Sequence, residues 1–243
     1  MCNLKGPLPT AALADIHGNV QALDAVLADP RFAAAERVVV LGDVVAGTFP
    51  AETFDRLAAF GDRVRILRGN ADRLVLEGDD EESRWVHDRL GPERVSAVRA
   101  WPASFPLEVE GLGAVRCCHA TPGDDEEILT RITPEADFAE ALKGTNEPLV
   151  VGGHTHVQFD RREGPRGFVN VGSVGRPYEG VPGAYWALLG PGVELMRTDY
   201  DVEGAAEAAL ASGQPSSDVV AEMLLRPPTA EEATAKFEAM RGT

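Results

Sequence analysis

The stretch Leu8-Pro9-Thr10-Ala11-Ala12-Leu13-Ala14-Asp15-Ile16-His17-Gly18-Asn19 places an apolar run directly before two potential metal ligands. Residues 8–14 have the composition of a buried strand, and residues 19–28 then carry apolar side chains at helical spacing. Side chains two positions apart on an extended segment share a face, so Asp15 and His17 can reach one metal ion. The stretch therefore predicts a strand, a turn that bears ligands, and a helix.

Two further strands end in the same way. Residues 37–41 and 63–67 are expected to be buried strands, and residues 52–60 between them a helix. Asp43 follows the first of these strands and Asn70 follows the second. Alternating strands and helices predict a parallel sheet with crossover helices. Open α/β sheets bind ligands at the carboxyl ends of their strands, so these motifs are expected to meet there.

The rest of the chain is expected to complete one domain, residues 1–243. A helical insert is predicted at about residues 79–100, and a C-terminal helical tail with a polar end from about residue 201. A helix is predicted over residues 124–142, with a break near Pro134 and with Thr133 as its second cap. Strands are predicted at residues 104–109, 113–119, 157–161, 167–171, 184–189 and 194–198. The last four are expected to form a further sheet of mostly antiparallel strands.

Five short motifs carry the chemistry, in the order Asp15-Ile16-His17, Gly42-Asp43, Gly69-Asn70, His119 and Gly153-His154-Thr155-His156. Each has an ordinary explanation by itself: a helix cap, a turn, or a hydrogen-bonded core histidine. Together they contain four of the five histidines, and only His87 lies outside them. Carboxylate, amide and imidazole groups form mixed O/N sites for divalent metals. Seven such residues indicate two metals that share a ligand, as in hydrolases of phosphate esters.

Composition narrows the class of protein. There are 23 Lys and Arg against 39 Asp and Glu, a net charge of −16, which argues against bulk nucleic-acid binding and against anionic membranes. No apolar run is long enough for a membrane span, and no signal peptide is recognisable. Cys2, Cys117 and Cys118 lack the spacing of a zinc or redox motif. We interpret them as reduced thiols of a cytoplasmic protein.

At this point the chain resembles a known family, the calcineurin-like metallophosphoesterases. Their pattern is Asp-x-His, Gly-Asp, Gly-Asn-His, His and Gly-His-x-His. Asn170-Val171-Gly172-Ser173-Val174-Gly175 and His119-Ala120-Thr121-Pro122 further resemble a prokaryotic subgroup of small, stand-alone phosphodiesterase-like members. The resemblance implies a four-layer α/β-β/α sandwich, with two packed mixed sheets flanked by helices and the metals at their edge.

The resemblance also implies a role for each ligand. Asp15, His17, Asp43 and His156 would hold a first metal ion, and Asp43, Asn70, His119 and His154 a second, with Asp43 as the bridge. A hydroxide between the metals would attack phosphorus, with Asp43, Asn70 and His119 in the catalytic group. Mn, Fe, Zn, Ni and Co suit this ligand set. The implied substrate is a small phosphodiester or activated phosphomonoester, and a homodimer is compatible with the family.

The chain departs from the family's pattern after Gly69-Asn70. The family usually has a histidine there, assigned to proton donation, where this chain has Ala71 followed by Asp72. General acid catalysis is worth about 10²–10⁴ in rate, so activated esters are expected to react better. Asp72 can act as the acid only if its pKa is raised, and a helix cap or a residue that orients a ligand is the simpler interpretation. His87 is a second candidate, with a solvated surface residue as the simpler interpretation.

Basic residues beside the motifs are candidates for binding phosphate oxygens. Arg176, which follows the glycine-rich loop at residues 170–175, ranks first, and Arg73 and Asn70 join it as predicted substrate-binding residues. An ion pair with one of the 39 acidic residues is the alternative for each arginine. The alternative function is a weak or inactive metal- or nucleotide-binding regulatory protein, for which Ala71 is the argument. A protein phosphatase is a less favoured third.

Overall fold

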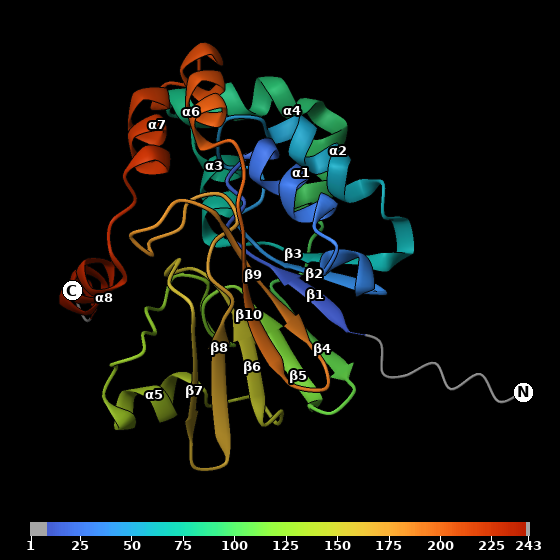
Figure 1. Ribbon diagram of the computed structural model, residues 1–243, viewed down its shortest axis with the longest axis vertical. Helices are drawn as coiled ribbons and strands as arrows, with labels where there is room; N and C mark the ends of the chain where they lie inside the picture. Colours follow the sequence, from blue (N-terminus) through green and yellow to red (C-terminus); the bar gives the residue numbers. More distant parts are fainter. Residues whose placement is uncertain (1–8, 242–243) are drawn as a thin grey trace, which may run out of the picture.

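Two five-stranded sheets pack face to face in the structure, a computed structural model that describes residues 9–241 (Figure 1). Leu8 and Cys2, to which sequence predictions apply, lie outside the described residues. The strands are β1 (Thr10–Leu13), β2 (Arg37–Leu41), β3 (Val64–Leu67), β4 (Ser104–Val109), β5 (Gly113–Cys118), β6 (Leu149–Gly152), β7 (Phe159–Glu163), β8 (Arg166–Asn170), β9 (Ala184–Leu189) and β10 (Val193–Thr198). The α-helices are α1 (Val20–Ala28), α2 (Pro50–Ala58), α3 (Asn70–Glu77), α4 (Glu81–Arg99), α5 (Glu135–Ala141), α6 (Val202–Ala211), α7 (Ser217–Leu225) and α8 (Ala230–Met240).

Both sheets are mixed. The first has the order β10-β9-β1-β2-β3, in which β1, β2 and β3 are parallel and β9 is antiparallel to β1. The second has the order β4-β5-β6-β8-β7, with a parallel centre and antiparallel edges. The predicted separate sheet of late, mostly antiparallel strands is therefore wrong, because β9 and β10 join the first sheet. The run at Ala184–Leu189 is apolar on both faces, which suits an inner strand of that sheet.

Alternation along the strands separates the layers of the core. In β1 and β2, Ala11, Leu13, Val38 and Val40 face the helices, whereas Ala12, Ala14, Val39 and Leu41 face the second sheet. This follows from the two-residue repeat of a strand whose faces are both buried. A third cluster, which includes Phe138 of α5 and Phe168 of β8, covers the outer face of the second sheet. The expected four-layer α/β-β/α sandwich is confirmed.

The helical predictions are confirmed except for one. The predicted insert forms α4, which packs on α2 and α3, and Val86, Leu90 and Val98 enter the first core cluster. Residues 124–132, however, are not helical, and α5 begins only at Glu135. Side chains satisfy the backbone there: Asp124 accepts from the Glu126 N–H, and Thr133 accepts from the Thr130 N–H. Thr133 does not cap α5.

The cysteines of β5 behave as predicted from their adjacency. Cys117 packs between the two sheets and Cys118 packs under α5, so the two thiols point to opposite faces. Both are free and buried, and burial raises the pKa of each thiol, so they serve as core residues. Within residues 9–241, no helix combines the length and the apolar character that a membrane crossing requires.

Candidate metal centre

Strand ends from both sheets bring the predicted ligands to one place. β1 leads to Asp15 and His17, β2 to Asp43 and β3 to Asn70 in the first sheet; β5 leads to His119 and β6 to His154 and His156 in the second. The turns after β1 and β2 also hold each other, because Asp15 N–H donates to Gly42 O at 3.0 Å and His17 N–H to Asp43 O at 2.8 Å. The seven predicted ligands therefore come from five strands of two sheets.

Four of these residues form a compact buried cluster. Asp15, His17, Asp43 and His156 each offer a ligand atom, and these atoms all lie within 4.8 Å of one another. His156 Nε2 is 3.2 Å from His17 Nε2 and 3.3 Å from Asp15 Oδ1. His17 Nε2 is 3.6 Å from Asp43 Oδ2. This is the set that the family resemblance assigns to the first metal ion.

The other three predicted ligands lie beside this cluster, next to Asp43 and Asp15. His119 Nε2 lies 3.4 Å from Asp43 Oδ2 and 2.8 Å from Asn70 Oδ1. The rings of His119 and His154 meet edge to face, with centroids 5.2 Å apart. Asp43 thus lies against a histidine of each group, and its second oxygen, Oδ1, accepts from the Ala71 N–H at 2.8 Å.

Backbone carbonyls fix the tautomer of all four imidazoles. The pairs are His17 Nδ1 with Ala46 O at 3.1 Å, His119 Nδ1 with Leu41 O at 2.7 Å, His154 Nε2 with Glu126 O at 3.1 Å, and His156 Nδ1 with Arg176 O at 2.6 Å. Because a carbonyl only accepts, the nitrogen facing it carries the proton. The other ring nitrogen is then the one that can bind a metal ion, which is the usual arrangement of a histidine ligand.

A bound cation would suit this arrangement of acceptor atoms. The lone pairs of His17 and His156 face each other, and Asp15 Oδ1 is buried without a hydrogen-bond partner among the described residues. Oxygen and nitrogen acceptors that converge without a donor repel one another, and each buried unpaired polar atom is costly. The donor set matches divalent first-row metals, so the residues present fit a metal ion.

The backbone is strained where the ligands attach. Asp15, His17, Asp43, His154 and His156 have φ between 48° and 72°, and they are the non-glycine residues with positive φ in the described chain. This left-handed region costs a residue with a side chain about 1 kcal/mol or more, and such strain gathers at functional sites. Glycines allow the close approach: a Cβ on Gly153 would lie 2.3 Å from Asp15 Oδ2.

Mutual electrostatics set the protonation states. Burial raises the pKa of Asp15 and Asp43, but His156 and His119 respectively outweigh it, so both pKa values end below the usual range. Burial lowers the pKa of His17 to about 3 and that of His154 to about 4. Burial also opposes the charge on His119, yet Asp43 raises its pKa to about 10. Most ligands are therefore in the form that binds a metal, whereas His119 must first release a proton.

Asp72 has its oxygens turned toward the backbone. Oδ1 accepts from the N–H groups of Val44 and Val45 at 2.9 and 2.8 Å, and Oδ2 accepts from the Gly69 N–H at 3.2 Å. Its side chain is fully buried, and burial, with the nearby charge of Asp43, raises its pKa to about 7. The geometry favours its interpretation as a capping and positioning residue that ties the turn after β2 to the start of α3.

The predicted substrate-binding arginines differ in their surroundings. Arg73 makes a two-pronged ion pair with Asp125 and also contacts Glu126, so its guanidinium is already neutralised. Arg176 lies beside the centre, where its carbonyl holds His156 and its side chain lines a cavity of about 250 Å³ with His17 and Ala71. Its buried Nε has no hydrogen-bond partner among residues 9–241.

His87 is not among the residues gathered at the centre. It lies on α4 and lines a separate cavity with residues of the same helix, half-buried rather than solvated. Two neighbours of the centre have no sequence signal: the Glu126 carbonyl, in a segment predicted to be helical, and Phe237, the lone aromatic of a polar C-terminal helix. The rings of Phe237 and His154 have centroids 6.3 Å apart.

The fold and this cluster define a class of protein. The sequence model of the calcineurin-like phosphoesterase superfamily domain matches residues 9–189, and the chain belongs to this superfamily. An uncharacterized protein of Methanocaldococcus jannaschii is 25% identical over 225 residues, covering 81% of this chain and 90% of the relative.

Solved structures show the same fold. A metallophosphoesterase from Sphaerobacter thermophilus aligns with TM-score 0.75 and 22% identity, covering 91% of this chain and 99% of that one. A hypothetical protein from Pyrococcus horikoshii aligns with TM-score 0.78 and 20% identity over the same shares. The predicted family is therefore confirmed, and the buried Asp and His cluster is a possible metal-binding site within it.

Proposed function

We propose that this protein is a metal-dependent phosphoesterase with two divalent cations, which hydrolyses phosphodiesters or activated phosphomonoesters. The observation that carries the proposal is the acceptor-only cluster of Asp15, His17, Asp43 and His156, whose ligand atoms lie within 4.8 Å of one another. The adjoining Asn70, His119 and His154 are the proposed ligands of the second cation. Such a pair supplies Lewis acidity toward phosphoryl oxygens and lowers the pKa of the attacking water.

The residues around the cations have separate tasks. Arg176 is the proposed clamp for a phosphoryl oxygen, because its buried Nε is unpaired and shares a cavity with His17. Asp43 keeps the two ligand groups together while its Oδ1 holds the Ala71 N–H. The methyl group of Ala71 cannot give a proton to a leaving group, which is why esters of acidic alcohols are the proposed substrates.

The test is hydrolysis of bis-p-nitrophenyl phosphate and p-nitrophenyl phosphate by protein stripped of metal, with Mn, Ni, Co, Zn and Mg restored singly. We expect activity that returns with a metal and is lost in Asp43→Asn. Arg176→Met should raise KM at least tenfold, with Arg73→Met as the matched control because Arg73 is paired with Asp125. Two bound metals without turnover of either ester would refute the proposal.

A regulatory protein that binds metal or nucleotide is the second candidate, and Ala71 is the observation that favours it. Ala71→His separates the two functions, because it restores the acid at the position the family uses. A gain of at least tenfold in kcat on p-nitrophenyl phosphate would indicate an enzyme weakened by the loss of this acid. Unchanged, negligible turnover in both forms, with tight ligand binding, would favour the regulator.

A further inference from the structure

A second cavity adjoins the metal centre on the side of the C-terminal helix. Its volume is about 420 Å³, and its lining includes Tyr178, Met223, Pro228, Phe237 and Met240. Cavities of about 300–1,000 Å³ with an apolar lining are typical of small-molecule sites. The wall contains two thioethers and two aromatic rings, a combination that accommodates planar apolar groups.

Aromatic contacts connect this cavity to the ligands. Tyr178 stacks on His156 with centroids 4.6 Å apart, and Phe237 lies 6.3 Å from both Tyr178 and His154 by ring centroid. His154 and His156 belong to the metal-binding motif after β6. The cavity and the centre therefore share a wall, and a group attached to a phosphate at the centre has this cavity within reach.

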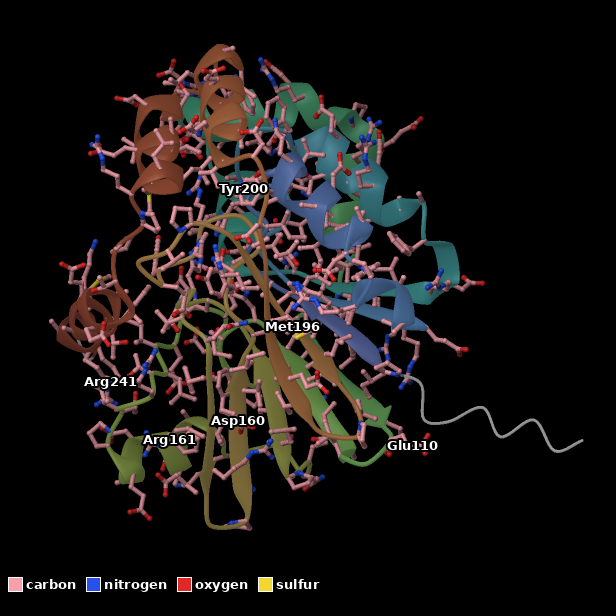
Figure 2. All side chains as sticks on the ribbon, viewed as in Figure 1. Glu110, Asp160, Arg161, Met196, Tyr200 and Arg241 are labelled. Carbon is pink, nitrogen blue, oxygen red and sulfur yellow. The ribbon has the colours of Figure 1, made fainter. Side chains whose placement is uncertain are left out.

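Helix α8 is fastened where it forms the cavity wall. Glu238 accepts from the hydroxyls of Thr130 and Thr133 at 2.6 and 2.5 Å, and Arg241, labelled in Figure 2, donates to Asp137 at 2.8 Å. In Figure 1, α8 stands apart from α7 on an extended segment, on the side of the molecule where α5 lies. These contacts hold Phe237 at a fixed place beside His154, as a binding wall requires.

The cavity beside Ala71 differs from this one in its charged and aromatic groups. Arg176, Asp80 and Glu82 line it together with several apolar residues. The cavity at α8 is instead lined by the rings of Tyr178 and Phe237, on which a planar group can stack. A planar ring is therefore expected in the cavity at α8, and the phosphoryl group near Arg176.

We propose that the cavity between Tyr178 and α8 binds a planar aromatic ring carried by the phosphate ester, as in an aryl or nucleoside ester. This inference rests on the proposed function for the position of the phosphate. It names the substrate class, with Phe237 and Tyr178 as the residues that determine specificity. Lys236 and Glu232, which also line the cavity, offer polar contacts to substituents of the ring.

The test measures binding, so that it does not depend on turnover. Calorimetry on the metal-loaded full-length protein compares 1-naphthylmethylphosphonate with methylphosphonate, whose P–C bonds are not hydrolysed. We expect the naphthyl ligand to bind at least tenfold more tightly, since its ring can stack on an aromatic side chain of the cavity and methylphosphonate has no ring. Phe237→Ala should remove most of this preference, and Phe237→Leu, which keeps apolar volume, should retain part of it.

Leu225→Ala is the matched control, because Leu225 is an exposed apolar residue of α7 outside the cavity lining. It should leave the preference intact. Equal affinity for the two ligands, no binding of either, or a preference that survives both Phe237 variants would overturn the inference. Preferential binding that depends on Phe237 in a protein without ester hydrolysis would support the inference and refute the proposed function.

Discussion

Replacing Asp72 with Ala tests whether this carboxylate is a positioning residue or an acid. The substitution removes the acceptor of three backbone N–H groups, those of Val44, Val45 and Gly69. Asn would keep an oxygen for Val44 and Val45, but its NH₂ group would meet the Gly69 N–H. We therefore expect the order of stability to be wild type, then Asp72→Asn, then Asp72→Ala.

The expected loss of stability in Asp72→Ala follows from the three hydrogen bonds and from the burial of the carboxylate. Hydrogen bonds to a charged group contribute about 1.5–3 kcal/mol each. Burial and the nearby charge of Asp43 oppose this contribution, since they raise the pKa of Asp72 to about 7 despite the hydrogen bonds. Breaking a buried network leaves three donors unpaired, so Asp72→Ala should lower the free energy of unfolding by about 3–5 kcal/mol. The Asn variant should lose about half as much.

Two measurements distinguish a positioning role of Asp72 from a role as a general acid. Urea unfolding in the presence of a chelator gives the free energy of unfolding without stabilisation by bound metal. The dependence of kcat on leaving-group pKa over a series of aryl phosphates gives the contribution of an acid. A loss below 1 kcal/mol in Asp72→Ala would refute the positioning role. So would an activity deficit of Asp72→Asn that grows steadily with leaving-group pKa.

Three further predictions concern the centre and its support. Gly153→Ala places a Cβ 2.3 Å from Asp15 Oδ2, so it should lower the free energy of unfolding by about 1–3 kcal/mol and weaken metal binding. The control Gly123→Ala, with open space around it, should change neither quantity. Equal metal affinities of the two variants would contradict the reasoning. Mn at about 1,000 times its Kd should raise the free energy of unfolding by about 4 kcal/mol and the Tm by about 8–16 °C. Both increases should be smaller in Asp15→Asn. A Tm that does not change when a chelator removes the metal would count against the site. Hydrogen bonds from Arg31 hold the pKa of Asp29 below 3.8, so the stability that this carboxylate contributes is present above about pH 4 and is lost as the pH falls below that. Asp29→Asn should therefore reduce the fall in the free energy of unfolding below about pH 4. An unchanged pH dependence in this variant would exclude the contribution.

Local sequence patterns were sufficient to predict the strands that lead directly into the candidate metal ligands. The apolar runs at β1, β2 and β3 are short and bounded, so the turn residues Asp15, Asp43 and Asn70 fall at strand ends by position alone. The pairing of β9 with β1 was not predictable in this way, because it joins residues far apart in sequence. It depends on which of the two sheets has an unpaired strand edge where β9 arrives. Sequence spacing carries no information about that choice.

Side-chain hydrogen bonds to the backbone explain why the predicted helix at residues 124–132 is absent. Residues 124–132 have helical composition, but Asp124 and Thr133 bond to nearby N–H groups and stabilise an irregular segment instead. That segment supplies the Glu126 carbonyl to His154. Phe237 escaped notice because one aromatic residue on a polar helix is ordinary, and its importance arises only from the place where α8 is fastened.

The four carbonyls that orient the histidines have a consequence for evolution. Leu41, Ala46, Glu126 and Arg176 supply these contacts with main-chain oxygens, so the identity of their side chains does not enter the imidazole orientation. Descendant sequences can vary at these positions, as long as the local path of the chain is kept, without disturbing the tautomers. The surroundings of the cluster can then diverge while the orientation of its four histidines is inherited unchanged.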